Sequence, residues 1–130
     1  MNNFFKRNIQ QIVRFIVSGL IASTFNFISY WSLYLLSENL LFASITGYCI
    51  GILVSFICAK LWVFKNVPSP PLVKSFSLFC FIYFLGGIEM TLVIVFLNQL
   101  LENYKISWLC GAFIGTLNNY VGSKYLSFKK

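Results

Sequence analysis

The chain has 130 residues, of which 58% are hydrophobic, 19% are aromatic and only 10% are charged, and it contains no histidine. A soluble domain of this size needs a polar surface that this composition cannot supply, so a soluble globular fold is excluded. Ten lysines and arginines against three glutamates give a net charge of +7. In a membrane protein such an excess reflects topology, so we expect no nucleic-acid partner.

Apolar segments of about twenty residues recur, and at roughly 1.5 Å per residue each is long enough to cross a ~30 Å hydrocarbon core. The first two are separated by a tight turn at Glu38 and Asn39. Pro68, Pro70 and Pro71 form a loop between the halves, because proline ends helices and lacks a backbone donor. The sequence predicts an all-α membrane protein with four transmembrane helices, over residues 14–36, 40–64, 75–97 and 106–128.

The cations fall on one side of this predicted topology. Nine of the ten precede the first segment, flank the central loop or end the chain, whereas Lys105 alone lies on the other side. Lysine and arginine mark cytosolic loops, so we expect a multi-pass protein of the cell membrane with both termini in the cytosol. Anionic lipid headgroups are the expected partners of this cationic side.

The second half of the chain repeats the first. A shift of 64 residues places "GYCIGILVSFICAKLWVFKN" on "GAFIGTLNNYVGSKYLSFKK" without a gap. Two-helix units in tandem keep one orientation, so we predict a parallel duplication within one transmembrane domain, residues 1–130, with repeats over 14–66 and 75–130. Small residues recur every four positions in both copies and predict that the second and fourth segments pack together. They are Ala43, Gly47, Gly51, Ser55, Ala59, Ser107, Gly111, Gly115, Asn119 and Ser123.

Four polar side chains lie near the middle of the predicted segments: Asn26, Glu89, Asn118 and Asn119. A carboxylate that faces lipid is costly, so we expect Glu89 to face the interior, to be protonated or to have a partner. These residues are a candidate functional site. A purely structural role in hydrogen bonding between helices is the alternative.

The stretches "AKLWVFKN" and "SKYLSFKK" end the two halves, and each carries a lysine about one turn inside the membrane. A lysine stem can lie along apolar surface while its ammonium reaches the headgroups. Because the lysine recurs at equivalent sites, we predict that Lys60 and Lys124 converge on one phosphate, with Arg14 as a forked donor. Simple anchoring is the alternative. The expected interfacial aromatic residues are Trp62, Phe64, Tyr125 and Phe128.

Two stretches of the chain resemble a known family. The opening segment "RFIVSGLIASTFNFISYWSLYLL" is one, and "SFICAKLWVF" at residues 55–64 is the other. The second follows the pattern Asn-Phe, three residues, Arg or Lys, any residue, Trp-Val-Phe, except for serine at its first position. The copy "NYVGSKYLSF" at residues 119–128 keeps the asparagine and loses the tryptophan. From residue 14 onward the chain resembles the GtrA-like proteins, small four-helix membrane proteins implicated in moving polyprenyl-phosphate-linked sugars for cell-surface polysaccharide glycosylation.

The resemblance implies a flippase that delivers a polyprenyl-phosphate-linked monosaccharide to an extracytoplasmic membrane glycosyltransferase. On this expectation Lys60, Lys124 and Arg14 hold the phosphate, and Glu89 and the asparagines offer partners to sugar hydroxyls. Two alternatives stay open: a non-transporting partner of a membrane glycosyltransferase, and a proton-coupled exporter of hydrophobic cations. Four helices make a narrow groove, so we also expect a homo-oligomer.

The sequence offers no groups for catalysis by the protein itself. It has no histidine, no nucleophile beside a base and no glycine-rich phosphate loop, so we expect neither an enzyme nor a cofactor. The four cysteines lie in apolar segments without metal-ligand spacing, and we expect small buried hydrophobes and no metal site. They are Cys49, Cys58, Cys80 and Cys110.

Overall fold

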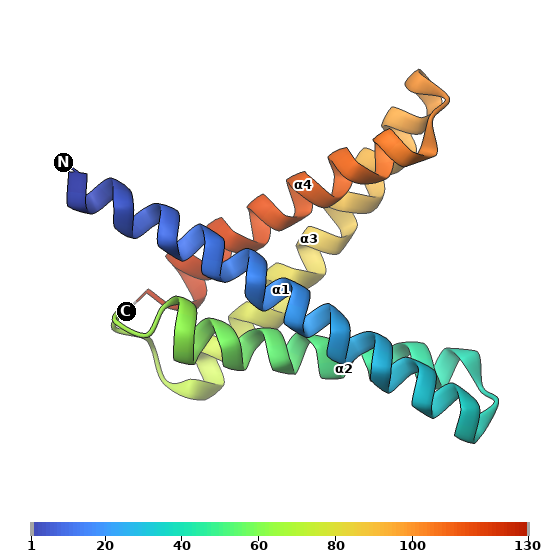
Figure 1. The fold of residues 1–130 in the computed structure, drawn as a ribbon, viewed down its shortest axis with the longest axis horizontal. Coiled ribbons are helices and arrows are strands. Elements are labelled where there is room, and N and C mark those ends of the chain that lie inside the picture. Colours follow the sequence, from blue (N-terminus) through green and yellow to red (C-terminus); the bar gives the residue numbers. More distant parts are fainter. Residues whose placement is uncertain (1, 130) are drawn as a thin grey trace. The chain divides into compact units, whose positions relative to one another are not determined.

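The chain folds into two helical hairpins, one in each half. The computed structural model describes residues 2–129, except for the side chains at positions 40 and 104. The chain divides into two compact units, Met1–Asn66 and Val67–Lys130, and each is described here by itself. All regular elements in the described residues are helical, which confirms the predicted all-α class (Figure 1).

The first hairpin consists of two helices and a short π-helical turn. Helix α1 runs over Asn2–Ser37 and helix α2 over Leu40–Cys58, and the π-helical turn η1, Ala59–Val63, continues α2 directly. Helix α1 packs against both α2 and η1. Helix α1 thus begins twelve residues before the predicted transmembrane segment, residues 14–36, and contains all of it.

The second hairpin has the same order of elements. Helix α3 runs over Leu72–Leu101, helix α4 over Tyr104–Gly122, and the π-helical turn η2, Ser123–Ser127, follows α4. The Ser127 hydroxyl donates to the Ser75 carbonyl oxygen at 2.6 Å, which ties η2 to the first turn of α3. Helix α3 is longer at both ends than the predicted segment, residues 75–97.

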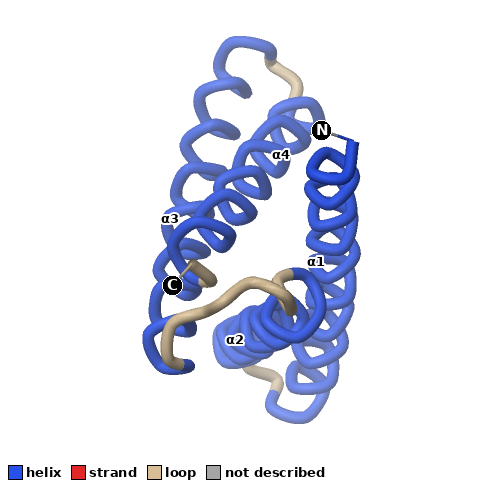
Figure 2. The backbone as a smooth tube through the Cα atoms, turned by 90° about the vertical axis from the view of Figure 1, so that its left-hand side faces the viewer, coloured by secondary structure: helices blue, strands red, loops and turns tan. Residues whose placement is uncertain are grey.

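Both hairpins reverse direction through the same tight turn. Glu38 and Glu102 adopt the left-handed conformation, with φ of 52° and 50°, and each donates its N–H to the carbonyl oxygen four residues back. Asn39 and Asn103 then cap the next helix, because their side-chain oxygens accept first-turn N–H groups at 3.0 to 3.2 Å. The predicted turn at Glu38 and Asn39 is confirmed. Figure 2 shows the loops at these turns and at the connection around the prolines.

Small residues bring the helices of the first hairpin into close contact. A Cβ atom at Gly47 would lie 3.0 Å from the Asn26 carbonyl oxygen, and one at Gly51 would lie 3.0 Å from the Asn26 Cβ. These positions have no room for a larger side chain. The glycines therefore let the backbone of α2 approach α1, which is how helices associate where lipid provides no hydrophobic driving force.

The second hairpin uses the corresponding glycines in the same way. A Cβ atom at Gly111 would lie 3.0 Å from the Met90 carbonyl oxygen, and one at Gly115 would lie 3.3 Å from the Gly86 carbonyl oxygen. The prediction that these small residues join the second and fourth segments is wrong, because α1 and α3 already occupy these faces within each hairpin. The sequence pattern locates the contact surface but does not identify the helix that covers it.

Matching features of the two hairpins lie 64 residues apart. The left-handed glutamates, the asparagine caps, the close-packed glycines and the π-helical turns all obey this separation. Buried side chains obey it as well, including those of the first and third helices. Pairs of buried residues at this separation are Phe15 and Phe79, Ala43 and Ser107, Ala59 and Ser123, Val63 and Ser127, and Phe64 and Phe128.

Three helical stretches are long and apolar enough to cross a membrane: Asn2–Ser37, Leu41–Val63 and Leu72–Leu101. Helix α4 does not reach the same apolarity, because Lys105, Asn118 and Asn119 lie within it. The chain is thus a membrane protein with several apolar helices, and a fourth crossing by α4 stays a prediction.

Cysteine labelling tests that fourth crossing. If α4 spans the membrane, Ser69→Cys and Lys129→Cys will be modified from the same side, the cytosolic one, and Ser37→Cys from the opposite side. The measurement is modification by a membrane-impermeant maleimide in intact cells and in inverted vesicles, in a background without native cysteines. Modification of Lys129→Cys and Ser69→Cys from opposite sides would show that α4 does not cross.

Candidate functional site

Each hairpin ends in a π-helical turn that holds one of the predicted lysines. Lys60 is the second residue of η1 and Lys124 is the second residue of η2. The backbone N–H groups of Phe64 and Phe128 donate to the carbonyl oxygens five residues back, at 2.8 and 2.9 Å. Short π-helical turns are rare and often occur at functional sites. The extra residue also shifts the side chains that follow it out of α-helical register.

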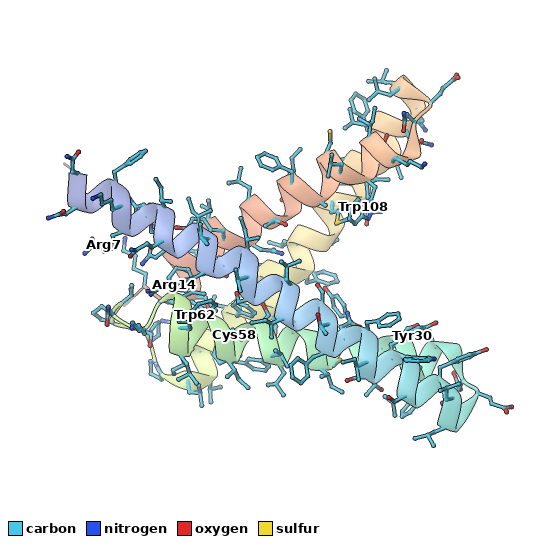
Figure 3. The ribbon with its side chains drawn as sticks, viewed as in Figure 1. Arg7, Arg14, Tyr30, Cys58, Trp62 and Trp108 are labelled. Carbon is cyan, nitrogen blue, oxygen red and sulfur yellow. The ribbon has the colours of Figure 1, made fainter. Side chains whose placement is uncertain are left out.

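The first hairpin brings Arg14 to the same turn as Lys60. The Arg14 Nη1 donates to the Trp62 carbonyl oxygen at 3.4 Å, and its guanidinium carbon lies 6.0 Å from the centroid of the Trp62 ring (Figure 3). Arginine carries five N–H donors in a rigid fork, so donors beyond the one on Trp62 can bind phosphate oxygens. Of the three predicted phosphate ligands, Lys60 thus belongs to η1 and Arg14 contacts that turn from α1 through Trp62.

The second hairpin surrounds its lysine with aromatic rings. The Lys124 Nζ lies 5.7 Å from the Tyr120 ring centroid and 5.5 Å from that of Tyr125. Cations within about 6 Å of a ring face are attracted to it. Leu78 stands at the position equivalent to Arg14, so the two turns differ in how they support their lysine. The convergence of Lys60 and Lys124 on one phosphate stays a prediction.

Buried side-chain atoms of the second hairpin that have no hydrogen-bond partner among the described residues include the Asn119 Oδ1 and the Ser123 Oγ, and the Ser123 side chain is fully buried. The two residues are four positions apart and so lie on one face of the helix. A buried polar group without a partner costs about 1 to 3 kcal/mol. Asn119 Oδ1 can accept a hydrogen bond, and the Ser123 hydroxyl can both accept and donate one.

Gly86 of α3 makes room for the Asn119 amide. A Cβ atom at Gly86 would collide with the Asn119 Oδ1, whereas one at the next residue, Gly87, would meet no atom within 4 Å. In the first hairpin the equivalent positions hold Ala22 and Ser55. The second hairpin thus combines a larger polar side chain on one helix with a smaller residue on the other.

The other predicted polar residues do not join Asn119 in this contact. Glu89 lies on an exposed part of α3, so of the three alternatives for this residue its own hairpin does not provide an interior position, and protonation or a partner remain. Asn26 packs against Gly47 and Gly51 in the first hairpin. Asn118 is half-buried on α4. Of the four candidates, Asn119 alone places an unsatisfied buried atom in a described helix contact.

The aromatic residues divide into two kinds. Trp62 and Tyr125 are exposed, as expected for a membrane interface. Phe64 and Phe128 are 2% and 1% exposed, so their prediction as interfacial residues is corrected: they close the two π-helical turns against the hairpins. The Phe128 ring packs edge-on to Phe79 of α3, at 6.0 Å between centroids.

The unsatisfied hydroxyl of Ser123 could not be predicted from the sequence pattern. The four-residue spacing marks Ser123 as a packing residue, and that spacing does not depend on whether the hydroxyl has a hydrogen-bond partner. The available signal was the change from Ala59 in the first hairpin to serine in the second.

Within residues 2–129 no cluster of potential metal ligands occurs. The prediction of buried cysteines is also corrected, because Cys49 is exposed and Cys58, Cys80 and Cys110 are only half-buried.

Comparison with known proteins adds two findings. A family model described as "GtrA/DPMS, transmembrane domain" matches residues 14–128, which confirms the resemblance based on the opening segment and the lysine motif. The chain is also 26% identical over 120 residues to "Uncharacterized membrane protein YwcD" of Bacillus subtilis (strain 168). That alignment covers 89% of this chain and 94% of the Bacillus protein.

Adjacent glycines test the contact between Gly86 and Asn119. Gly86→Ala should lower the free energy of unfolding in detergent by about 1 to 3 kcal/mol, because the new methyl group displaces the amide. Gly87→Ala is the matched control and should be neutral or stabilising by up to about 1 kcal/mol, since alanine favours helix and its methyl group meets nothing. Adding Asn119→Ser to Gly86→Ala should restore stability. Equal stability of the two alanine variants would contradict this packing.

Proposed function

Because this chain belongs to the GtrA/DPMS transmembrane-domain family, we propose that it moves a polyprenyl-phosphate-linked monosaccharide from the cytosolic to the outer leaflet of the cell membrane. The moved lipid would serve cell-surface polysaccharide glycosylation. One observation carries this proposal beyond the family. In the described part of the chain the second hairpin buries the Asn119 Oδ1 and the Ser123 Oγ without a hydrogen-bond partner, and Ser123 directly precedes the cationic residue Lys124.

The Asn119 Oδ1 and the Ser123 Oγ are atoms that can form hydrogen bonds with sugar hydroxyl groups. In a membrane, polar atoms without a partner are costly, and a passing hydroxyl group removes that cost when it donates to Asn119 Oδ1 or bonds with Ser123 Oγ. The polyprenyl tail needs no such site, because it can remain in the lipid throughout. We therefore propose that only the polar headgroup passes through the protein.

The cationic side chains of Lys124, Lys60 and Arg14 can bind the phosphate. A phosphate forms short, charge-assisted hydrogen bonds with lysine and arginine, and arginine can bind two oxygens at once. Lys124 follows Ser123 directly in the sequence, so a headgroup whose sugar reaches Ser123 keeps its phosphate near this ammonium. Lys60 and Arg14 offer the same chemistry at η1.

We further propose that the hairpins are parallel copies of one unit. The shared separation of 64 residues between caps, glycines and π-helical turns supports this proposal. Parallel copies require four crossings and place both termini on the cytosolic side, together with Lys60 and Lys124. Both lysines would then lie at the leaflet in which the lipid-linked sugar is made, where they can bind its phosphate.

A second candidate function is that of a non-transporting partner of a membrane glycosyltransferase. The exposed Glu89 of α3 favours it, because a carboxyl group in a membrane helix needs a partner and this one faces away from its own hairpin. A transferase helix or a second copy of this chain could supply that partner. Export of hydrophobic cations has no such support, since the cations at both π-helical turns would repel the cargo.

Flipping by the purified protein separates the two candidates. Reconstituted in liposomes, the chain should expose a polyprenyl-phosphate sugar of the inner leaflet to a membrane-impermeant reagent. Lys124→Gln and Lys60→Gln should each weaken headgroup binding by about 1.5 to 3 kcal/mol, or roughly tenfold to a hundredfold, because a charged hydrogen bond is lost. Lys65→Gln, an exposed lysine just past η1, is the matched control and should behave as wild type.

Two outcomes would contradict the proposal. If the liposomes show no flipping while surface glycosylation in cells still depends on the chain, the accessory role is correct. If the double variant with both Lys60→Gln and Lys124→Gln flips the lipid at the wild-type rate, the lysines are membrane anchors and not phosphate ligands.

A further inference from the structure

Helix α1 extends beyond the rest of its hairpin. It has 36 residues and is therefore roughly 54 Å long, much more than a hydrocarbon core of ~30 Å requires. Arg14 lies at η1, the end of the second helix, so residues 2–13 continue past that end (Figure 1). These residues form about three helical turns, and most of their side chains are exposed.

This extension has two chemically different faces. At about 100° per residue, one side carries Phe5, Ile9, Ile12 and Val13. All four are exposed, with Phe5 at 67%. The opposite side carries Asn3, Arg7, Gln10, Gln11 and Arg14, with Lys6 at its border and Phe4 beside Arg7.

The apolar side is continuous with the outer surface of the transmembrane part of α1. Phe5, Ile9, Ile16 and Leu20 follow one another at spacings of four, seven and four residues, and all four are exposed. This line is distinct from the face that packs on α2, which buries Phe15 among others. The environment that covers Leu20 in the membrane therefore extends without interruption to Phe5.

The polar side begins only at the end of the hairpin. From Arg14 toward the C-terminus, this side of α1 continues with Val17 and Ile21, which are apolar. From Arg14 toward the N-terminus, it continues with Gln10 and Lys6, which are polar. A helix in water would be polar on all sides, and a helix in hydrocarbon would be apolar on all sides. A helix with one face of each kind matches the boundary between acyl chains and headgroups.

We propose that residues 2–14 form an interfacial anchor that holds α1 obliquely in the leaflet at the η1 end. Phe5 and Ile9 insert among the acyl chains, and Lys6 and Arg7 bind anionic lipid headgroups. The Arg7 guanidinium lies 5.9 Å from the Phe4 ring centroid, so a ring of the same helix holds this cation on the polar side. A transmembrane helix longer than the bilayer accommodates its excess length by tilting, and the apolar side of the extension sets the direction of that tilt.

Spin-label accessibility in the full chain tests this anchor. Ile9→Cys and Gln10→Cys are neighbours in the sequence that point about 100° apart, Ile9 to the apolar side and Gln10 to the polar side, and each is labelled in a background without native cysteines. The chain is reconstituted in vesicles of phosphatidylethanolamine and phosphatidylglycerol. Ile16→Cys serves as the lipid reference and Asn66→Cys as the water reference. The label at Ile9 should collide severalfold more with oxygen than with a nickel chelate, like Ile16, and the label at Gln10 should show the reverse, like Asn66.

Other outcomes would overturn the proposal. If both labels meet the nickel chelate like Asn66, the extension projects into water. If the Ile9 label is shielded from both reagents, protein covers this face. An equal contrast in vesicles of phosphatidylcholine alone would refute the role of Lys6 and Arg7. Should the cysteine-free chain fail to reconstitute, Ile9→Trp and Gln10→Trp give the same comparison, read as the change in quenching by brominated lipids relative to the native chain and its three tryptophans.

Discussion

Close approach of two backbones at small residues is the contact on which the rest of this structure depends. Lipid tails are as apolar as leucine, so helices in a membrane gain little from burying large side chains and associate through tight packing. Gly47 against Asn26, and Gly111 against Met90, bring each pair of helices to this distance. The turn geometry and the position of each lysine follow from the resulting hairpin.

The second hairpin differs from the first at positions where its side chains are more polar. Asn119 and Ser123 replace the smaller or less polar Ser55 and Ala59, and Gly86 opens the space that the amide fills. The hairpin can accept such changes because close packing at its glycines already holds its two helices together. This difference gives the second hairpin unsatisfied hydrogen-bonding atoms. It is the feature that sets a candidate headgroup path apart from plain helix packing.

Much of the fold was predictable from the sequence, because apolar length, proline and the tight turn are local signals. The contact partners of the glycines were not, since a spacing of four residues identifies a face and not the helix that covers it. Burial of Phe64 and Phe128 also escaped prediction, because it depends on the π-helical turns. Glu89 shows the same limit: its depth could be read from the sequence, but the direction in which it points could not.

The Asn119 side chain can be measured directly as a sugar-binding group. In the full chain in bilayers, solid-state NMR can follow its amide nitrogen, assigned by comparison with Asn119→Ser. If Asn119 binds the sugar, this resonance shifts when a polyprenyl-phosphate sugar is added and stays in place with polyprenyl phosphate alone. The Asn26 amide, packed on Gly47, should be unaffected by either lipid. An Asn119 resonance that does not respond to the sugar, in a chain that flips the lipid, would contradict the account.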